Sequence, residues 1–432
     1  MTPSIVYDLS RLVTRVLNTT PNGIDRIDLL LARRFLINGP MKALAVGLGF
    51  TGPRVLSNQA ALAAIERTSA AWREDLSPHE GSRAYEAVVA RLVDKPVGGE
   101  GYVGRIVVPR PRRPIHVVQT IVRHLPPGAR SPRRAAPHGA LYLNATHFPL
   151  EWSRHVAWLE DRPDVKPVFW IHDLLAVDRP EWFWGRESAL HAQRLDLLAR
   201  RGSGAAVASL SVEQSLRDHL ARRGAKHLPI VRIPLPVAPI FSEPRREDLR
   251  LAKARFFIVC GTIEPRKNHM VLLRTWRHLI DRFGADAPKL VVVGKRGWNN
   301  EEIVKALEDK TLFGHVIEVT GLPTADYKRL LDHCLALLAP SFGEGFGLPV
   351  AEALAVRAPV LAADISPFRE QKGSDVAYLD PSAEMEWREA IMARAFAARV
   401  LNSSDDAIPK PPDFQEQTFF AEFGAFLRNL SS

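Results

Sequence analysis

Short apolar runs alternate with amphipathic stretches along the whole chain, and this alternation limits the fold more than any other feature. The apolar runs are aliphatic or β-branched and lack strict apolar–polar alternation, which is typical of parallel strands covered on both faces. The stretches between them have helical periodicity. The expected strands are 4–9, 43–50, 140–146, 167–173, 204–210, 229–234, 254–260, 289–295, 315–321, 336–341 and 358–364. The expected helices include 24–37, 187–200, 212–223, 268–283 and 325–334.

The chain length indicates more than one domain. At 432 residues, of which 46% are hydrophobic and 25% charged, the chain has the size and composition of a globular protein with two cores. A linker is expected at 234–248, where four prolines and a charge cluster follow a strand. The sequence therefore predicts an α/β protein with two doubly wound domains, at 1–236 and 237–432, the second ending in a C-terminal tail.

The net charge of +10 is concentrated in one segment. No acidic residue lies between Glu100 and Glu151, whereas eight arginines do: Arg105, Arg110, Arg112, Arg113, Arg123, Arg130, Arg133 and Arg134. The region 96–139 is rich in Gly, Pro and Arg, and we expect a long, partly mobile insertion there. Its basic charge fits a solvated loop or docking onto an anionic membrane surface. Nucleic acid is not expected as a partner, because aromatic residues do not interleave with the arginines and no nucleic-acid module accompanies them.

The cysteines and the N-terminus point to the cytoplasm. Cys260 and Cys334 both lie in apolar runs, with neither metal-ligand spacing nor a disulfide framework. No segment is long and apolar enough to span a membrane, and Asp8 and Arg11 interrupt the N-terminal stretch as no signal peptide allows. We expect a cytoplasmic protein, with peripheral attachment to the inner face of the membrane as an option through the Arg105–Arg134 segment.

The strongest functional signal is SFGEGFGLPVAEALA at 341–355. It follows an apolar strand, has three glycines in five positions and enters an expected helix with Pro349 in the first turn. Glycines let the backbone approach a ligand, and a helix start offers unpaired N–H groups to an anion. Glu344 in the loop and Glu352 in the helix then face a ligand at the strand ends. The alternative is an ordinary turn with one solvated glutamate and one that interacts with the helix dipole.

A second signal is the loop of CGTIEPRKNHMVLLRTWRHL at 260–279. A strand ends there, Arg266 and Lys267 follow, and an amphipathic helix begins. Arginine can bind a diphosphate with two parallel hydrogen bonds, and lysine can neutralise it as a point charge. The alternative is a solvated loop with surface cations. Together the two loops offer cations for a diphosphate and carboxylates for sugar and ribose hydroxyls.

These two segments resemble the retaining glycosyltransferases of the GT-B class, family 4. The signature of that family is a pair of glutamates separated by seven residues, and Glu344 and Glu352 have this spacing. The segment GIDR at 23–26 is similar to a Gly-Ile-x-Arg element of its mannosyltransferase branch. Further similar segments are WIHDLLAVDRPEWF (170–183), ASLSVEQSL (208–216), VTGLPTADYKRLL (319–331) and DVAYLDP (375–381).

The resemblance implies a GT-B fold, in which two Rossmann-like domains face each other across a cleft. The first domain, with the basic insertion at about 96–139, would bind the acceptor, and the second would bind the nucleotide sugar. Glu344 would bind the hydroxyls of the donor sugar and Glu352 the ribose. Lys267 and Arg266 would stabilise the diphosphate leaving group, with more of the phosphate binding falling on Arg266 because Thr262 stands where some relatives have an arginine.

The resemblance implies a second set of donor-site residues, in three groups. Backbone N–H groups of the glycine loop would bind the diphosphate, a His-Asp pair would lie near sugar and acceptor, and an N-terminal glycine would let its loop approach the donor. These residues are Gly345, Phe346 and Gly347; His172 and Asp173; and Gly23. A lone histidine at a strand end is more often structural, and it is the match to the His-Asp element that makes His172 a catalytic candidate.

The expected activity is retaining, metal-independent hexosyl transfer without a cofactor. No Asp-x-Asp pair follows an apolar strand, and fixed cations suit a leaving diphosphate. The expected partners are a nucleotide sugar, with GDP-mannose favoured, and a glycan or lipid-linked acceptor of a surface polysaccharide or lipopolysaccharide. Rhamnose, glucose or galactose donors are alternatives within this class. Outside it, the alternatives are a non-catalytic nucleotide-sugar-binding subunit and a basic-surface interaction module on an inherited fold.

Overall fold

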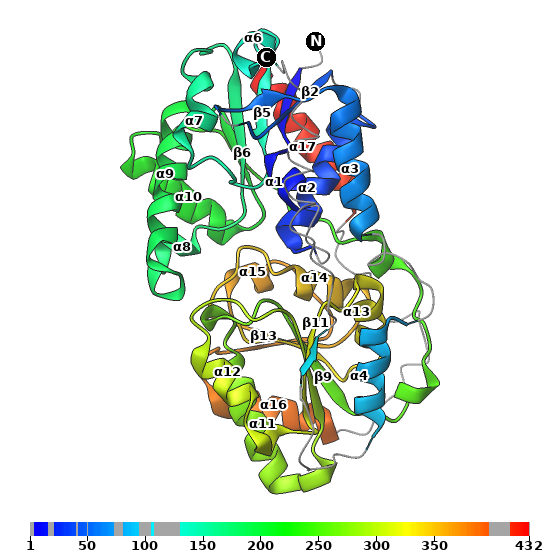
Figure 1. Ribbon diagram of the computed structural model, residues 1–432. Coiled ribbons are helices and arrows are strands. Elements are labelled where there is room, and N and C mark those ends of the chain that lie inside the picture. The colour runs from blue at the N-terminus through cyan, green and yellow to red at the C-terminus, as the bar shows by residue number, and fades with distance from the viewer. Residues whose placement is uncertain are drawn as a thin grey trace.

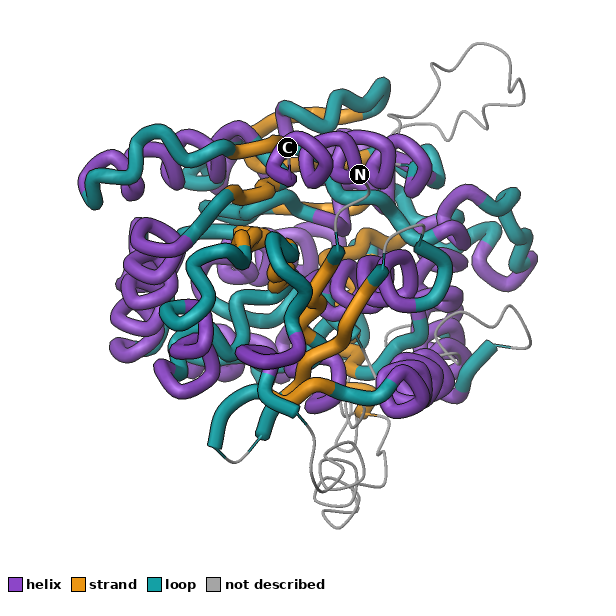
Figure 2. The backbone as a smooth tube through the Cα atoms, turned by 90° about the horizontal axis from the view of Figure 1, so that it is seen from above, coloured by secondary structure: helices purple, strands orange, loops and turns teal. Residues whose placement is uncertain are grey.

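The chain folds into two α/β domains, each built around one sheet (Figure 1). This computed structural model describes residues 4–15, 21–39, 42–49, 51–72, 81–94, 105–107, 130–396 and 415–431. Within these ranges, each sheet has seven strands. Viewed from above, helices flank the strands on both sides (Figure 2). No helix in the described ranges has both the length and the apolar character needed to cross a membrane.

The sheet of the first domain is parallel except for one edge pair. Its order is β3 (Arg54–Val55), β2 (Ala43–Gly47), β1 (Ile5–Asp8), β5 (Leu141–Asn144), β6 (Lys166–Ile171), β7 (Gly204–Val207) and β8 (Ile230–Arg232), with β3 antiparallel to β2. Alternate residues of β1 enter different cores, Ile5 and Tyr7 on one face and Val6 on the other, because successive strand residues point to opposite sides.

The helices of the first domain cover both faces of this sheet. On one side lie α1 (Ser10–Arg15), α2 (Gly23–Leu36), α3 (Asn58–Trp72) and α17 (Glu416–Ser431), and on the other α9 (Gly185–Arg201) and α10 (Leu210–Arg222) (Figure 1). Short helices α6 (Pro132–Ala135), α7 (Ser153–Val156) and α8 (Leu175–Asp178) complete the domain. Helix α17 returns from the far end of the sequence, and its Phe419 and Phe423 pack against Trp170 of β6.

The sheet of the second domain is parallel throughout. Its order is β14 (Val376–Leu379), β13 (Val360–Ala363), β12 (Leu337–Ala339), β9 (Phe256–Cys260), β10 (Lys289–Val293), β11 (Val316–Thr320) and β4 (Arg105–Val107). The helices are α11 (His269–Phe283), α12 (Glu301–Leu307), α13 (Thr324–Leu331), α14 (Leu348–Ala355), α15 (Ser366–Arg369) and α16 (Glu384–Phe396). Because β9 and β12 are neighbours, the loops after them meet at one edge of the sheet.

The predicted α/β architecture is confirmed, and all eleven expected strands overlap observed ones. The five expected helices correspond to α2, α9, α10, α11 and α13. The sequence interpretation missed β3, β4 and β14, which are short edge strands. Most of the expected insertion at 96–139 lies outside the described residues, as do the arginines at 110, 112, 113 and 123. Membrane docking through this segment therefore stays a prediction.

One strand inside the expected insertion has a defined place. Strand β4 pairs with β11, Arg105 opposite Glu318, and the two side chains form an ion pair at 3.1 Å. Helix α4 (Arg83–Val93), just before it in sequence, also packs on the second domain (Figure 1). Together with the return of α17, this means that the chain crosses between domains outside the predicted 234–248 linker. Helix α4 and strand β4 precede residue 236 but pack on the second domain, and α17 follows it but packs on the first. For the other elements the predicted domain boundary at residue 236 stays a prediction.

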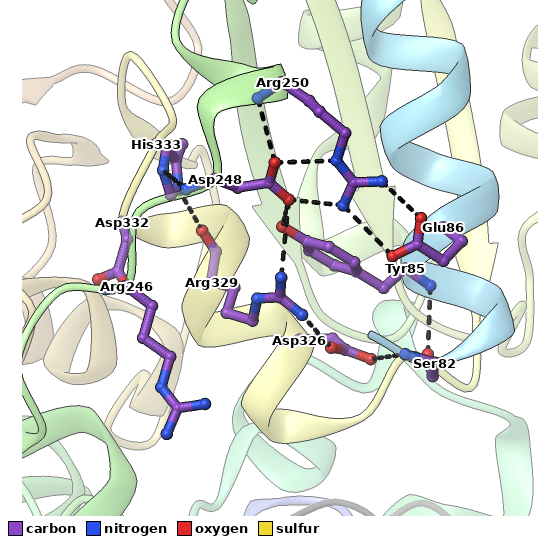
Figure 3. A network of polar contacts seen from close by, with 10 residues as sticks. All are labelled: Ser82, Tyr85, Glu86, Arg246, Asp248, Arg250, Asp326, Arg329, Asp332 and His333. Carbon is purple, nitrogen blue, oxygen red and sulfur yellow. Dashed lines mark hydrogen bonds and ion pairs between the residues drawn. The ribbon is translucent and has the colours of Figure 1, made fainter. Parts of the chain in front are cut away.

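A polar network fixes α4 to the second domain (Figure 3). The Tyr85 hydroxyl donates to Asp248 at 2.9 Å, and the Arg329 guanidinium lies 4.0 Å from the centre of the Tyr85 ring. Arg250 donates to both Asp248 and Glu86, at 2.7 and 2.6 Å. The hydroxyl of this buried tyrosine has a charged partner. The network therefore fixes one position of α4 on the second domain and also contributes binding energy.

Candidate functional site

The candidate site lies at the carboxyl ends of β9 and β12, on the edge of the second sheet that faces the first domain. The loop after β12 ends at Gly347, whose φ of 87° belongs to the left-handed region that favours glycine. A side chain there would also meet Phe368, at 2.3 Å from an added Cβ atom. Pro349 then occupies the first turn of α14, as the sequence predicts.

The Glu344 carboxylate is the centre of the charged cluster. It is buried, and it accepts hydrogen bonds from the Ser341 hydroxyl at 2.8 Å, from Arg266 at 2.8 Å and from Lys267. Burial alone would raise the pKa of Glu344, but the two cations outweigh it and hold the pKa at about 2. Glu344 is therefore an anion at every physiological pH. The structure brings together three of the four predicted catalytic residues.

The Arg266 guanidinium lies between the carboxylates of Glu264 and Glu344. Its Nε lies 2.7 Å from a carboxylate oxygen of Glu264, and its Nη1 donates to the Gly343 carbonyl at 3.0 Å as well as to Glu344. Burial raises the pKa of Glu264, with the neighbouring cations opposing it. The guanidinium is thus fixed between two carboxylates, so it can meet a ligand without first having to be ordered.

Asn268 ties the two loops together. It adopts left-handed backbone geometry, with φ of 52°, where Asn is one of the few side chains tolerated. Its amide donates to the carbonyls of Pro340 and Pro381, at 3.1 and 2.8 Å. The short turn Pro265–Lys267 is therefore fixed against the glycine loop, which explains why Lys267 and Glu344 meet although they are far apart in sequence.

A small pocket opens beside this cluster. The space between its atoms is about 290 Å³, part of it open to solvent, and its walls include Cys260, Lys267, Ser341, Glu344 and Gly347. A carboxylate, an ammonium group and backbone at a helix start therefore share one cavity. Such a cavity can receive a group that carries both hydroxyls and negative charge.

Glu352 lies in α14 and contacts the opposite domain. Its carboxylate is buried and accepts from Arg26 Nη1 at 2.9 Å. Burial raises the pKa of Glu352 to about 7, although Arg26 opposes the shift. The second nitrogen of Arg26 donates to the Thr324 hydroxyl at 2.7 Å. The two signature glutamates therefore differ: Glu344 belongs to the pocket cluster, whereas Glu352 bridges the two domains.

His172 stands at the end of β6 with its ring nitrogen already engaged. Its Nε2 lies 2.7 Å from the Ala145 carbonyl, which can only accept, so Nε2 carries the proton. Its backbone N–H donates to His147 at 3.1 Å, and burial lowers the pKa of His172 to about 4. The ring is neutral and offers only Nδ1 as a further acceptor. Asp173 accepts from the backbone N–H of Leu175 at 3.2 Å.

The glycine loop makes close contact with the first domain. An added Cβ atom on Gly345 would lie 2.1 Å from the His172 carbonyl oxygen, so only glycine fits. Gly23, at the start of α2, likewise leaves room for Leu348, which would lie 2.6 Å from an added Cβ atom. Phe346 is buried, and its carbonyl accepts from Gln371 at 2.5 Å. The predicted donor-site residues thus lie where the two domains meet, and their roles stay predictions.

Four residues of this region were not predicted to have a role. Ser341 and Glu264 contact the charged cluster, while Arg26 and Ser209 join the two domains. All four stand inside segments that the sequence singled out, Ser209 in ASLSVEQSL at 208–216. The signal was therefore present, but nothing in a local pattern says which partner a side chain will meet.

Sequence comparison adds independent information about the second domain. A family model described as glycosyl transferases group 1 matches residues 241–393. The serotype-specific mannosyltransferase WbdA of Escherichia coli is 29% identical over 246 residues, which are 52% of this chain and 29% of WbdA. The O-antigen chain mannosyltransferase B of Escherichia coli is 28% identical over 176 residues, covering 38% of this chain and 46% of that protein. The match thus spans less than half the length of either relative.

Structural comparison extends over both domains. The crystal structure of Anabaena Alr3699/HepE in complex with UDP superposes with a TM-score of 0.52 at 15% identity, covering 90% of this chain and 89% of HepE. At this identity the likeness speaks for the fold alone. The chain has a GT-B fold, and its residues 241–393 match the glycosyl transferases group 1 family.

Proposed function

We propose that the protein is a glycosyltransferase that moves a hexose from a nucleotide sugar to a glycan or lipid-linked acceptor of a surface polysaccharide or lipopolysaccharide. Mannose from GDP-mannose is the favoured donor, because both E. coli relatives are named mannosyltransferases. Binding of a nucleotide sugar is supported by HepE, which was crystallised with UDP and with UDP-glucose. The matched region covers less than half the length of either E. coli relative, so the activity of the whole protein is part of this proposal.

The observation that carries the proposal is the Glu344 cluster with its pocket. Lys267 and Arg266 both contact the Glu344 carboxylate at the ends of β9 and β12. In the proposed complex the diphosphate forms ion pairs with both cations and so shares them with Glu344. Glu344 then accepts hydrogen bonds from the hydroxyls of the donor sugar, which lies in the pocket.

The proposed chemistry follows from where charge develops. As the bond between sugar and phosphate breaks, negative charge grows on the diphosphate, and fixed cations stabilise it without reorganisation. Lys267 and Arg266 are such cations, so we propose transfer without a metal ion. Following the family resemblance, we propose retention of the anomeric configuration. Contact between the two domains around Gly345 would exclude water and limit hydrolysis of the donor.

A donor panel tests this function. Purified protein is incubated with GDP-mannose, UDP-glucose, UDP-galactose and dTDP-rhamnose, with and without EDTA, and the released nucleoside diphosphate is quantified. Donor binding is read calorimetrically on the same samples. We expect one donor to be turned over in the presence of EDTA, and Glu344→Ala and Lys267→Ala to lose that turnover.

Two surface variants serve as matched controls. Glu302→Ala and Lys305→Ala remove a carboxylate and an ammonium group from exposed positions of α12, so both should turn over the donor like the wild type. Turnover abolished by EDTA would overturn the metal-free mechanism. If no donor is bound and no nucleoside diphosphate is released, the glycosyltransferase proposal is wrong.

A further inference from the structure

The first turn of α2 is built to present one side chain to the second domain. Asn22 accepts from the Asp25 backbone N–H at 2.9 Å, and the Asp25 carboxylate accepts from the Asn22 N–H at 3.1 Å, so the helix begins with a reciprocal cap. Gly23 and Arg26 are three residues apart and share a face. Since Gly23 packs against Leu348 of α14, Arg26 is directed at the same helix and at α13.

Glu352 is the group that Arg26 reaches. Glu352 is 5% exposed, and one guanidinium nitrogen of Arg26 lies 2.9 Å from its carboxylate while the other donates to Thr324. The other titratable groups around the carboxylate are Cys260 at the end of β9 and Tyr327 on α13. Burial raises the pKa of Cys260 to about 12 and the pKa of Tyr327 well above its usual range, so both are neutral. Arg26 is thus the cation that faces Glu352 among the described residues.

A buried carboxylate without a cation takes up a proton, because burial penalises the charged form. Ribose presents two neighbouring hydroxyls, and only an ionised carboxylate accepts from both of them with its two oxygens. A protonated Glu352 would spend one oxygen as a donor. The charge state of Glu352 therefore matters for a nucleotide, and that charge state depends on a residue of the opposite domain.

Building on the proposed function, we infer that Arg26 is a positioning residue of the nucleotide site. It is supplied by the first domain, and it favours the ionised form of the Glu352 carboxylate and orients it for the ribose hydroxyls. The ribose subsite is then complete only when the two domains are in contact. Arg26 acts through Glu352 and needs no contact with the nucleotide.

The test measures GDP and UDP binding by calorimetry between pH 6 and pH 9 for the wild type and for Arg26→Ala. Without its cation, Glu352 should protonate at a pH at least about one unit higher. At pH 7.5 we expect the affinity of Arg26→Ala to be at least about threefold lower, and we expect this difference to shrink at pH 9. Arg26→Lys should restore most of the affinity at pH 7.5.

Glu352→Gln isolates the effect. A phosphate group titrates near pH 6 on its own, with a second pKa of about 6, and the pH dependence that remains in Glu352→Gln belongs to the nucleotide. Adding Arg26→Ala to Glu352→Gln should change the affinity no further. Arg33→Ala, on the same helix but bonded to Ser69 of the first domain, should behave like the wild type. Arg26→Gln repeats the test with a longer side chain if Arg26→Ala lowers the melting temperature.

The outcomes separate this inference from the function on which it rests. If the wild type binds neither GDP nor UDP, both fall. If the wild type binds and the Arg26 variants keep its affinity and pH profile, the inference alone is wrong. It is also wrong if Arg26→Ala weakens binding equally with and without Glu352→Gln, because Arg26 would then act independently of Glu352.

Discussion

The Ser209 hydroxyl donates a 2.6 Å hydrogen bond to the Gly345 carbonyl, and this bond joins the two domains across the candidate site. Ser209 follows β7 in the first domain, whereas Gly345 belongs to the glycine loop of the second. The same hydroxyl also caps α10 by accepting from the Val212 N–H at 3.4 Å. One side chain therefore serves a helix and a domain contact, and a suitable pair of variants can separate these roles.

Ser209→Ala should lower kcat/KM for the proposed transfer about three- to tenfold, which corresponds to one hydrogen bond of about 0.5–1.5 kcal/mol. It should also lower the melting temperature, because the helix loses its cap. Ser209→Asp keeps an oxygen that can cap α10 but has no hydroxyl to donate. We expect it to keep the cap of α10 and to lose at least as much activity, because its carboxylate repels the Gly345 carbonyl oxygen. Wild-type activity in Ser209→Asp would show that the Gly345 contact does not matter for transfer.

Glu344→Gln should separate binding of a nucleoside diphosphate from transfer. The change leaves Lys267 and Arg266 without their shared anion, so the affinity for the diphosphate should stay equal or rise. Transfer should fall on the order of a hundredfold, because the acceptor for the sugar hydroxyls is weakened. Calorimetry with GDP and a rate assay on one protein sample measure both. A parallel loss of affinity and rate would argue that Glu344 serves only to hold the loop.

The pH–rate profile gives a second reading of the same residue. With a pKa of about 2, Glu344 is already ionised well below pH 5. An acidic limb of the profile between pH 5 and pH 8 must then come from another group and should persist in Glu344→Gln. Loss of that limb in the variant would contradict the assignment of Glu344 as a permanent anion.

The local patterns of the sequence were sufficient to predict the site loops. Glycine spacing and Pro349 mark the turn into α14, and Arg266 and Lys267 mark the turn after β9. Their meeting follows from parallel neighbouring strands, whose carboxyl ends share one edge. The hydrogen bond from Asn268 to Pro340, which sets the distance between the two site loops, was not predictable, since it depends on the left-handed backbone at Asn268.

The remaining features are non-local and carry no pattern of their own. Strand β4 has three residues, which is too short for a periodic signal, and its pairing with β11 is set by a segment more than two hundred residues later. Helix α17 shows an apolar face through Phe419 and Phe423, but this face does not say that it packs on the first domain. The contact of Arg26 with Glu352 likewise exists only once the domains are assembled.

Tyr85→Phe tests how firmly α4 is fixed to the second domain. A hydrogen bond to a charged partner contributes about 1.5–3 kcal/mol, so the amides of α4 should exchange with solvent roughly ten- to a hundredfold faster. Hydrogen exchange followed by mass spectrometry over 83–93 measures this directly. Tyr378→Phe is the control, because its hydroxyl donates to a neutral carbonyl at 3.2 Å and lies far from α4 in sequence. Unchanged exchange in Tyr85→Phe would mean that apolar packing alone holds the helix.

Acidification to pH 3.5 should leave the contact between Tyr85 and Asp248 in place. Arg250 first, and then Tyr85, lower the pKa of Asp248 in the folded protein far below that of an unfolded aspartate. The stability that a depressed pKa contributes is lost as the pH falls from the unfolded value of about 4 through the folded pKa, so Asp248 stays ionised in the folded protein at pH 3.5. The difference in α4 exchange between the wild type and Tyr85→Phe should therefore persist between pH 7 and pH 3.5, and its collapse in that range would mean that Asp248 takes up a proton there.

Asp28→Asn tests a buried carboxyl in the first domain. Asp28 is fully buried on α2 and accepts from the Tyr7 hydroxyl at 2.7 Å. Burial raises the pKa of Asp28 to about 7, against the opposing effects of Tyr7 and Arg11. For an acid with a raised pKa the folded state binds more protons than the unfolded state, so stability falls as the pH rises from about 4 through 7.

The asparagine variant should remove that slope. At pH 5 the aspartate is protonated, and Asp28→Asn should melt near or slightly below the wild type because its amide N–H needs a partner. At pH 8 the variant no longer carries the cost of a buried charge, which for a shift of this size is on the order of 1 to 4 kcal/mol. Its melting temperature relative to the wild type should therefore rise between pH 5 and pH 8, as differential scanning calorimetry can show. Asp25→Asn, on the same helix, loses its ion pairs with Arg11 and Arg15 and should be destabilised at both pH values. A constant difference for Asp28→Asn across this range would mean that Asp28 is ionised, or solvated, in the folded protein throughout.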